Sequence, residues 1–381
     1  MAFSIGESVR RLTKGLFTTG KESVLGVDIG SCSLKVVQLR KEGGKAILET
    51  YGELALGPYA QTDIGRATSM PAEEIAKALA ELSKEANVTA HRAGLSIPVR
   101  SSLLKVITLP TTNRNEVGKM APIEARKYVP VPIGEVTLDW WIIPERNYMS
   151  PGEAPPPSDD PTHREGVEVL LVAIHNETLA TYQKVIALAG LSTDAFEIET
   201  FSAIRATFGH DMLPTLILDI GASSTRVAIV EHGIVRVSHV VGKGSQDITL
   251  ALSKSMNMTF SDAENLKRGT AAPLGKQVEA SVVWDVAKPI FEYVFFEAVS
   301  VIRNYERQYR QSVAKVITIG GGTLFPNFQE IASGHFEVPV VSGNPFRKVE
   351  APAFLDPLLT EAGPSFAVAV GLALRELQDK T

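Results

Sequence analysis

The sequence has few cysteines, no long apolar run and only a small net charge. It holds one cysteine, Cys32, in 381 residues, which excludes an intrachain disulfide and a multi-cysteine metal site. A net charge of −5 gives no global positive field, so we expect no nucleic-acid binding. We find neither an unbroken apolar run of the roughly 18 residues that cross a bilayer nor a signal-peptide core, so we expect no transmembrane segment. With 44% hydrophobic residues, the composition predicts a folded soluble protein with more than one core. The single cysteine and the lack of a signal-peptide core lead us to expect a cytoplasmic protein.

Residues 24–39 and 215–230 repeat one pattern. In each copy an apolar strand carries an aspartate near its end, Asp28 or Asp219, and a turn of small residues leads into a second strand. Small residues let backbone N–H groups come close to an anion, so the pattern predicts two phosphate-binding hairpins that together clamp a nucleotide. The turn residues that we assign to nucleotide binding are Gly30, Ser31, Cys32 and Ser33 in the first copy and Gly221, Ala222, Ser223 and Ser224 in the second.

A third glycine-rich segment follows at 315–328, where a β-branched strand runs into Gly320, Gly321, Gly322 and Thr323. Three residues without a Cβ atom let a flat ring or a sugar lie against the backbone. Each of the three segments alone is typical of an ordinary tight turn. Their order and spacing, however, resemble the two phosphate loops and the adenosine loop of the actin, Hsp70 and sugar-kinase superfamily. The resemblance implies an α/β, actin-like fold of the duplicated ribonuclease-H type that binds ATP or ADP with Mg²⁺.

The resemblance narrows at residues 124–141, which read Glu-Ala-Arg-Lys-Tyr-Val-Pro-Val-Pro-Ile-Gly-Glu-Val-Thr-Leu-Asp-Trp-Trp. A Glu-Ala-x-x-Tyr-x-Pro-x-Pro motif ahead of a strand, together with the two aspartate turns, is similar to the type IV pilus assembly PilM family over residues 24–374. That family resembles the division protein FtsA in carrying a replaced subdomain after the first helix. The resemblance implies an ATP-binding scaffold, peripheral on the inner face of the inner membrane, that docks the N-terminal tail of a PilN-like inner-membrane protein.

The helix and strand patterns predict a divided chain. Residues 1–22 form a basic, loosely amphipathic leader, for which a membrane-surface contact and packing on the domain surface both stay open. Residues 90–174 form an inserted subdomain, and its proline-rich segment 150–161 is expected to be an exposed loop. The remainder divides into actin-like subdomain 1A, at 23–89, 175–218 and 361–381, and a second actin-like half (2A/2B) at 219–360.

The resemblance also assigns roles in phosphate chemistry. Asp28 and Asp219 would hold Mg²⁺ mostly through water, since this ion gives up its hydration shell reluctantly. Ser31 and Lys35 would face the terminal phosphates, although Lys35 also suits an exposed strand position. Glu199 stands where the superfamily carries the residue that orients water at the γ-phosphate, and phosphoryl transfer depends on such positioning. A helix-capping acid remains the alternative for Glu199.

A further pair, Glu264 and Lys267, lies three residues apart on a predicted helix and therefore on one face. It resembles the family's Ala-Glu-x-x-Lys element, which implies that Glu264 binds ribose hydroxyls and Lys267 covers the adenine ring. A surface ion pair is the alternative. In the second hairpin, Ala222 and Ser223 replace the paired glycines of many related ATPases, so we expect slow ATP turnover or none.

Two other functions fit the superfamily. An FtsA-like polymerising membrane tether would carry a linker and an amphipathic helix after its last core helix, whereas this sequence ends at 375–381 directly after that helix. A small-molecule kinase would need a general-base aspartate, and no aspartate of the 90–174 block stands in a kinase-like pattern. Self-association into dimers or filaments is left open.

Overall fold

The computed structural model describes residues 23–144, 166–193, 196–209, 213–269 and 279–378. The leader at 1–22 and the proline-rich loop at 150–161 lie outside the described residues, so the predictions made for them stay predictions.

Two five-stranded sheets share one topology. In each sheet the first three strands are antiparallel and the remaining pairs are parallel, which confirms the duplication seen in the sequence. The first sheet has the order β3-β2-β1-β4-β8, with β1 (Ser23–Ile29), β2 (Ser33–Glu42), β3 (Lys45–Ala55), β4 (Arg92–Ile97) and β8 (Phe196–Ile198). The second has the order β11-β10-β9-β12-β13, with β9 (Thr215–Ile220), β10 (Thr225–Glu231), β11 (Ile234–Val241), β12 (Lys315–Ile319) and β13 (Val340–Ser342).

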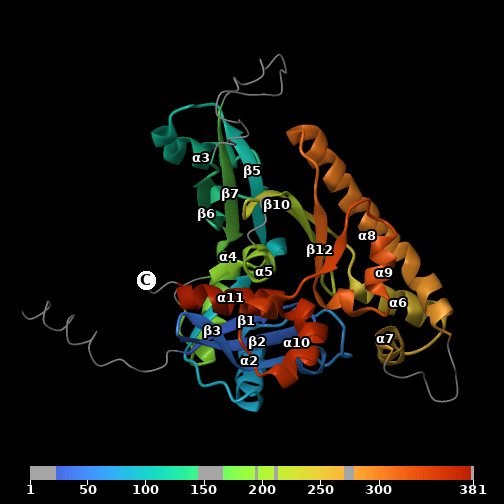
Figure 1. The fold of residues 1–381 in the computed structure, drawn as a ribbon. Helices are drawn as coiled ribbons and strands as arrows, with labels where there is room; N and C mark the ends of the chain where they lie inside the picture. The colour runs from blue at the N-terminus through green and yellow to red at the C-terminus, as the bar shows by residue number, and fades with distance from the viewer. Residues whose placement is uncertain (1–22, 145–165, 194–195, 210–212, 270–278, 379–381) are drawn as a thin grey trace, which may run out of the picture.

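Both faces of each sheet are covered, as continuous apolar strands require. In the first sheet Leu25 and Val27 pack against α2 (Ala72–Glu85) and α4 (Asn176–Leu188), and Val24 lies in the core on the opposite face. The second sheet packs against a long helix, α8 (Ala280–Tyr309), drawn in orange in Figure 1. The smaller helices of this half are α6 (Ser245–Ser255), α7 (Phe260–Arg268) and α9 (Phe328–Ser333).

Helices α5 (Glu199–Thr207) and α11 (Ala367–Gln378) pack between the two sheets. Their closest approach leaves no room for side chains, because a Cβ atom at Gly371 would lie 1.8 Å from the carbonyl oxygen of Ser202. Likewise, a Cβ atom at Gly26 of β1 would lie 1.9 Å from the carbonyl oxygen of Ala369. Glycine at these two places lets helix, helix and sheet meet backbone to backbone. The two halves are therefore joined by a tightly packed centre.

One segment, Ala353–Gln378, is long and apolar enough to cross a membrane by length and composition. It includes α10 (Asp356–Ala362) and α11, and 67% of its most apolar window is buried within the fold. Burial between α5 and the first sheet accounts for the apolar character of α11. Among the described residues this segment is therefore weak grounds for a membrane span.

The inserted block is a three-stranded antiparallel sheet with the order β5-β7-β6, covered by α3 (Val117–Ala125). Its strands are β5 (Ser102–Leu109), β6 (Val136–Ile142) and β7 (Val167–His175). The structure corrects two boundaries. Strand β4, which we expected in the insert, pairs in parallel with β1, because its apolar run suits a central strand covered on both faces. Residues 215–218, which we expected in subdomain 1A, belong to β9 of the second sheet.

Candidate functional site

A cavity of about 410 Å³ lies between the two halves. All three glycine-rich segments contribute to its wall, together with Asp28, Asp219, Glu199 and Lys35. Of the residues that we assigned to a site, Thr323 does not line the cavity. Its hydroxyl donates instead to the carbonyl oxygen of Gly320, 2.8 Å away, and so stabilises the third loop from behind.

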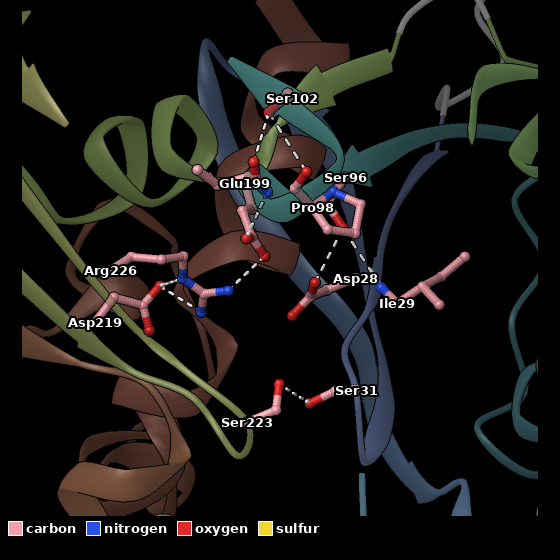
Figure 2. A network of polar contacts seen from close by, with 11 residues as sticks. Asp28, Ile29, Ser31, Ser96, Pro98, Ser102, Glu199, Asp219, Ser223 and Arg226 are labelled. Atoms are coloured by element: carbon pink, nitrogen blue, oxygen red, sulfur yellow. Dashed lines mark hydrogen bonds and ion pairs between the residues drawn. The ribbon is translucent and has the colours of Figure 1, made fainter. Parts of the chain in front are cut away.

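The two hairpin turns have the same geometry. In the first, the N–H of Gly30 donates to the carbonyl oxygen of Ser33 over 3.0 Å, and in the second Gly221 donates to Ser224 over 3.0 Å. The tips of the turns meet across the cavity, since the hydroxyl of Ser223 lies 3.1 Å from that of Ser31 (Figure 2). The two predicted hairpins therefore face each other, and their role as a nucleotide clamp stays a prediction.

The third loop needs glycine for two different reasons. Gly320 has a left-handed φ of +89°, and a Cβ atom there would lie 2.4 Å from Oδ1 of Asp219. A Cβ atom at Gly322 would lie 2.3 Å from Cγ2 of Ile220. Gly321, by contrast, has no heavy atom within 4 Å of such a position and lines the cavity. The loop thus presses on the second hairpin while leaving open space where a ligand would lie.

Arg226 is a charged residue of the cavity wall that the sequence analysis did not single out. Its Nη1 lies 2.6 Å from Oε2 of Glu199, and its Nη2 lies 2.8 Å from Oδ2 of Asp219 (Figure 2). Its Nε donates to the same Asp219 oxygen over 3.0 Å. A signal was available in the repeat itself, because Arg226 pairs across the hairpin with Asp219 just as Lys35 pairs with Asp28.

The first hairpin uses its basic residue differently. Lys35 lies 3.1 Å from Oε1 of Glu53 on β3 and donates to the hydroxyl of Ser33 over 2.7 Å. Burial lowers the pKa of Lys35, but the carboxylates of Glu53 and Asp28 outweigh burial and raise it overall. Lys35 is therefore a buried, charged member of the cleft wall and not an exposed strand residue.

Two carboxylates approach the cleft from the first half. Oδ1 of Asp28 accepts from the hydroxyl of Ser96 over 3.0 Å, and Oε1 of Glu199 accepts from the backbone N–H of Val99 over 3.0 Å (Figure 2). Burial raises the pKa of both carboxyl groups, although the positive charge of Arg226 opposes the shift in each case. Glu199 begins α5 but directs its carboxylate to Val99 and Arg226, so it is more than a helix-capping acid.

The predicted pair Glu264 and Lys267 is buried and forms an ion pair of 2.6 Å. Thr249 and Arg268 also donate to Glu264, over 2.7 Å each. Burial lowers the pKa of Lys267, whereas the pKa of Glu264 falls because Lys267 outweighs the opposing effect of burial. The pair lines the cavity, which favours the ligand-binding interpretation over a surface ion pair.

The cavity wall suits the phosphates and the ring of a nucleotide better than it suits the Mg²⁺ that accompanies them. Three small-residue loops around a 410 Å³ cavity suit the phosphates and a flat ring. The carboxylates suit Mg²⁺ less well, because Arg226 already engages Asp219 and Glu199. Among the described residues no group of three metal-ligating side chains is present, although Mg²⁺ needs only one or two carboxylates beside phosphate oxygens.

The model of the type IV pilus assembly protein PilM family matches residues 26–377. This chain belongs to the PilM family. The match spans both actin-like halves and the inserted block, so it confirms the resemblance that we drew from the sequence motifs.

The PilM chain is also similar to other actin-like proteins. Cell division protein FtsA of Neisseria meningitidis is 24% identical over 211 residues, which is 50% of each chain. Ethanolamine utilization protein EutJ of Salmonella typhimurium is 28% identical over 120 residues, 32% of this chain and 38% of that protein. The chain thus spans half or less of the curated relatives that it matches.

Solved structures agree on the fold. The structure of a PilM-PilN type IV pilus biogenesis complex matches with a TM-score of 0.76 and 24% identity over 93% of this chain and 98% of that one. MreB 5 of Spiroplasma citri, bound to AMPPNP, matches with a TM-score of 0.52 and 12% identity over 95% and 98%. The predicted actin-like α/β fold is confirmed.

We predict that Asp28→Asn raises the melting temperature at neutral pH. Burial raises the pKa of Asp28 above its ordinary value despite Lys35, Arg226 and Ser96, with Asp219 adding to the rise, so the ionised carboxylate costs stability. The gain should shrink as the pH falls through the raised pKa, since the wild-type carboxyl is then protonated too. Thermal unfolding from pH 5 to pH 8 measures this, with exposed Asp139→Asn as control. A loss of stability at neutral pH would contradict it.

Proposed function

We propose that this PilM chain is an ATP-binding scaffold of type IV pilus assembly that docks the N-terminal tail of a PilN-like inner-membrane protein. The observation that carries the proposal is the cavity lined by two matching hairpin turns and a glycine loop in a chain of the PilM family. The similarity to the solved PilM-PilN complex supports the choice of partner. Through such a partner the protein would lie at the inner face of the inner membrane.

Each wall of the cavity suits one part of ATP. Backbone N–H groups of the hairpin turns would hold the phosphates, and the glycine loop would lie along the adenosine. Glu264 and Lys267 would border the ribose and the ring. When bound, Mg²⁺ supplies positive charge to the phosphate oxygens, and Asp28 is the residue best placed to hold it. ADP in place of ATP would use the same contacts.

The contacts of Glu199 also support slow ATP turnover or none. Both carboxylate oxygens of Glu199 are engaged, one by the N–H of Val99 and the other by Arg226. A carboxylate held in this way is poorly placed to orient an attacking water. The proposal is therefore of a nucleotide that stays bound and shapes the protein.

We predict that Gly321→Leu lowers the affinity for ATP by at least about tenfold. A side chain at Gly321 meets no protein atom within 4 Å and would enter open space beside the cavity, so the fold should be retained. Calorimetric titration with ATP and Mg²⁺ measures the change. Gly134→Leu is the matched control, because Gly134 also has open space and lies in a 3-10 turn, Ile133–Glu135, of the inserted block. Equal ATP affinity in both variants, or no binding by the wild type, would contradict the proposal.

The inserted block offers an edge for an extended peptide. Strand β6 pairs on one side with β7 and lies at the edge of the three-stranded sheet. Its side chain at Trp141 is 68% exposed, whereas Trp140 packs toward the core of the block. An edge strand supplies unpaired backbone groups, and an aromatic side chain beside it supplies contact area. We place the docked tail along β6, on the side of the block that faces away from β5.

Two contacts would connect the nucleotide to this block. Arg100, just before β5, donates to the carbonyl oxygen of Ser223 in the second hairpin turn over 3.0 Å. Glu168 on β7 pairs with Arg236 on β11 over 3.0 Å. Nucleotide that fixes the second hairpin would stiffen the block through these links. Equal peptide affinity with and without ATP would mean that the coupling is absent.

We predict that Trp141→Ala weakens binding of a synthetic PilN N-terminal tail by at least about fivefold, because truncation of a buried interface tryptophan commonly costs more than about 1 kcal/mol. Fluorescence anisotropy of a labelled tail measures the affinity. Phe354→Ala is the matched control, since Phe354 is a similarly exposed aromatic residue, at 77%, on a different element. Equal losses in both variants, or no loss in either, would contradict docking at β6.

A further inference from the structure

Arg226 and Lys35 stand at equivalent positions of the repeated hairpin but make different contacts. Each pairs in register with the aspartate of its own hairpin, Asp219 or Asp28. Lys35 turns to Glu53 and stays within its own half. Arg226 reaches across the interface between the halves to Glu199 while holding Asp219 with two donors. The second hairpin therefore makes an ion pair between the halves through Arg226, whereas Lys35 of the first hairpin pairs within its own half.

Arg226 places a positive charge between two carboxylates, where a bound metal ion could otherwise supply it. Asp219 and Glu199 come from different halves, are 5% and 6% exposed, and converge on one guanidinium whose side chain is 20% exposed. The two carboxylates would repel each other if both were ionised and unpaired in so dry a place. Either a bound cation or a basic side chain solves that problem, and here the chain itself supplies the positive charge. The buried carboxylates raise the pKa of Arg226, so it is charged throughout the physiological range.

We propose that Arg226 is a built-in cation that occupies Asp219 and Glu199 in place of a divalent metal ion. A fixed positive charge at 2.6 to 2.8 Å from these carboxylates repels a second cation and takes the lone pairs that would bind it. Metal binding at the cleft then rests on Asp28 and on the phosphates of a bound nucleotide. Arg226 acts as a positioning residue, because it sets which carboxylates are available and holds Glu199 away from water. The inference deepens the proposed function and rests on the same cleft.

The experiment measures Mn²⁺ binding to the nucleotide-free protein from the electron paramagnetic resonance signal of the free ion. Wild type should bind Mn²⁺ weakly, and Arg226→Lys, which keeps the charge, should match it within about threefold. Arg226→Gln removes the charge and uncovers both carboxylates, so we expect Mn²⁺ affinity to rise at least about tenfold. Adding Asp219→Asn to Arg226→Gln should abolish that gain, which places the ion at Asp219.

A second variant guards against a folding failure. Removing one partner of a buried ion pair is strongly destabilising, so Arg226→Gln alone could unfold the protein. Arg226→Gln combined with Glu199→Gln keeps the local net charge and still uncovers Asp219, and it too should bind Mn²⁺ more tightly than wild type. Equal Mn²⁺ affinity in wild type and in the Gln variants would overturn the inference, as would tight binding by wild type.

One parallel measurement distinguishes a failure of the proposed nucleotide function from a failure of the Arg226 inference. ATP titration of the wild-type protein reports on the cleft as a nucleotide site, whereas the Mn²⁺ experiment contains no nucleotide. If the wild type does not bind ATP but Arg226→Gln still raises the affinity for Mn²⁺, the result counts against the nucleotide function alone. If the wild type binds ATP but Arg226→Gln leaves the affinity for Mn²⁺ unchanged, the result counts against the built-in cation alone.

Discussion

The contact of Arg226 with carboxylates from both halves of the molecule is the interaction on which the closed cleft depends. Asp28, Asp219 and Glu199 are each between 5% and 8% exposed and face one cavity. Buried carboxylates of like charge repel strongly unless a positive group lies among them. Arg226 supplies that group within hydrogen-bonding distance of two of them. The hairpin tips at Ser31 and Ser223 can then approach to 3.1 Å.

Other contacts hold the same closed arrangement. At the centre, Gly371 and Gly26 let α11 meet α5 and β1 without intervening side chains. At the rim, Ser261 of α7 donates to Asp63 over 2.8 Å, and the guanidinium of Arg66 lies 4.3 Å from the centre of the Phe260 ring. The halves are thus joined by close backbone packing at the centre and by a few side-chain contacts at the rim.

Much of this could be predicted from the sequence, since the repeated strand, turn and strand pattern is local. A strand ending in Asp-x-Gly and small residues specifies its own hairpin, and the three glycines of the third loop are readable in the same way. Arg226 was missed because its partner Glu199 belongs to the other half, and nothing local reports contacts across halves. The sheet membership of β4 was missed because its neighbour β1 lies more than sixty positions earlier in the chain. The contact of Thr323 with Gly320 could not be predicted, because the sequence does not show on which side of the loop a side chain lies.

The central claim is that the cavity between the two hairpins is a nucleotide site. Hydrogen–deuterium exchange of the full chain, with and without ATP and Mg²⁺, tests it most directly, because a ligand held by backbone N–H groups protects those same amides. The account predicts ATP-dependent protection at 28–35, 219–226 and 320–324, the three segments around the cavity. Unchanged exchange in all three at saturating ATP, or protection confined to other parts of the chain, would contradict it.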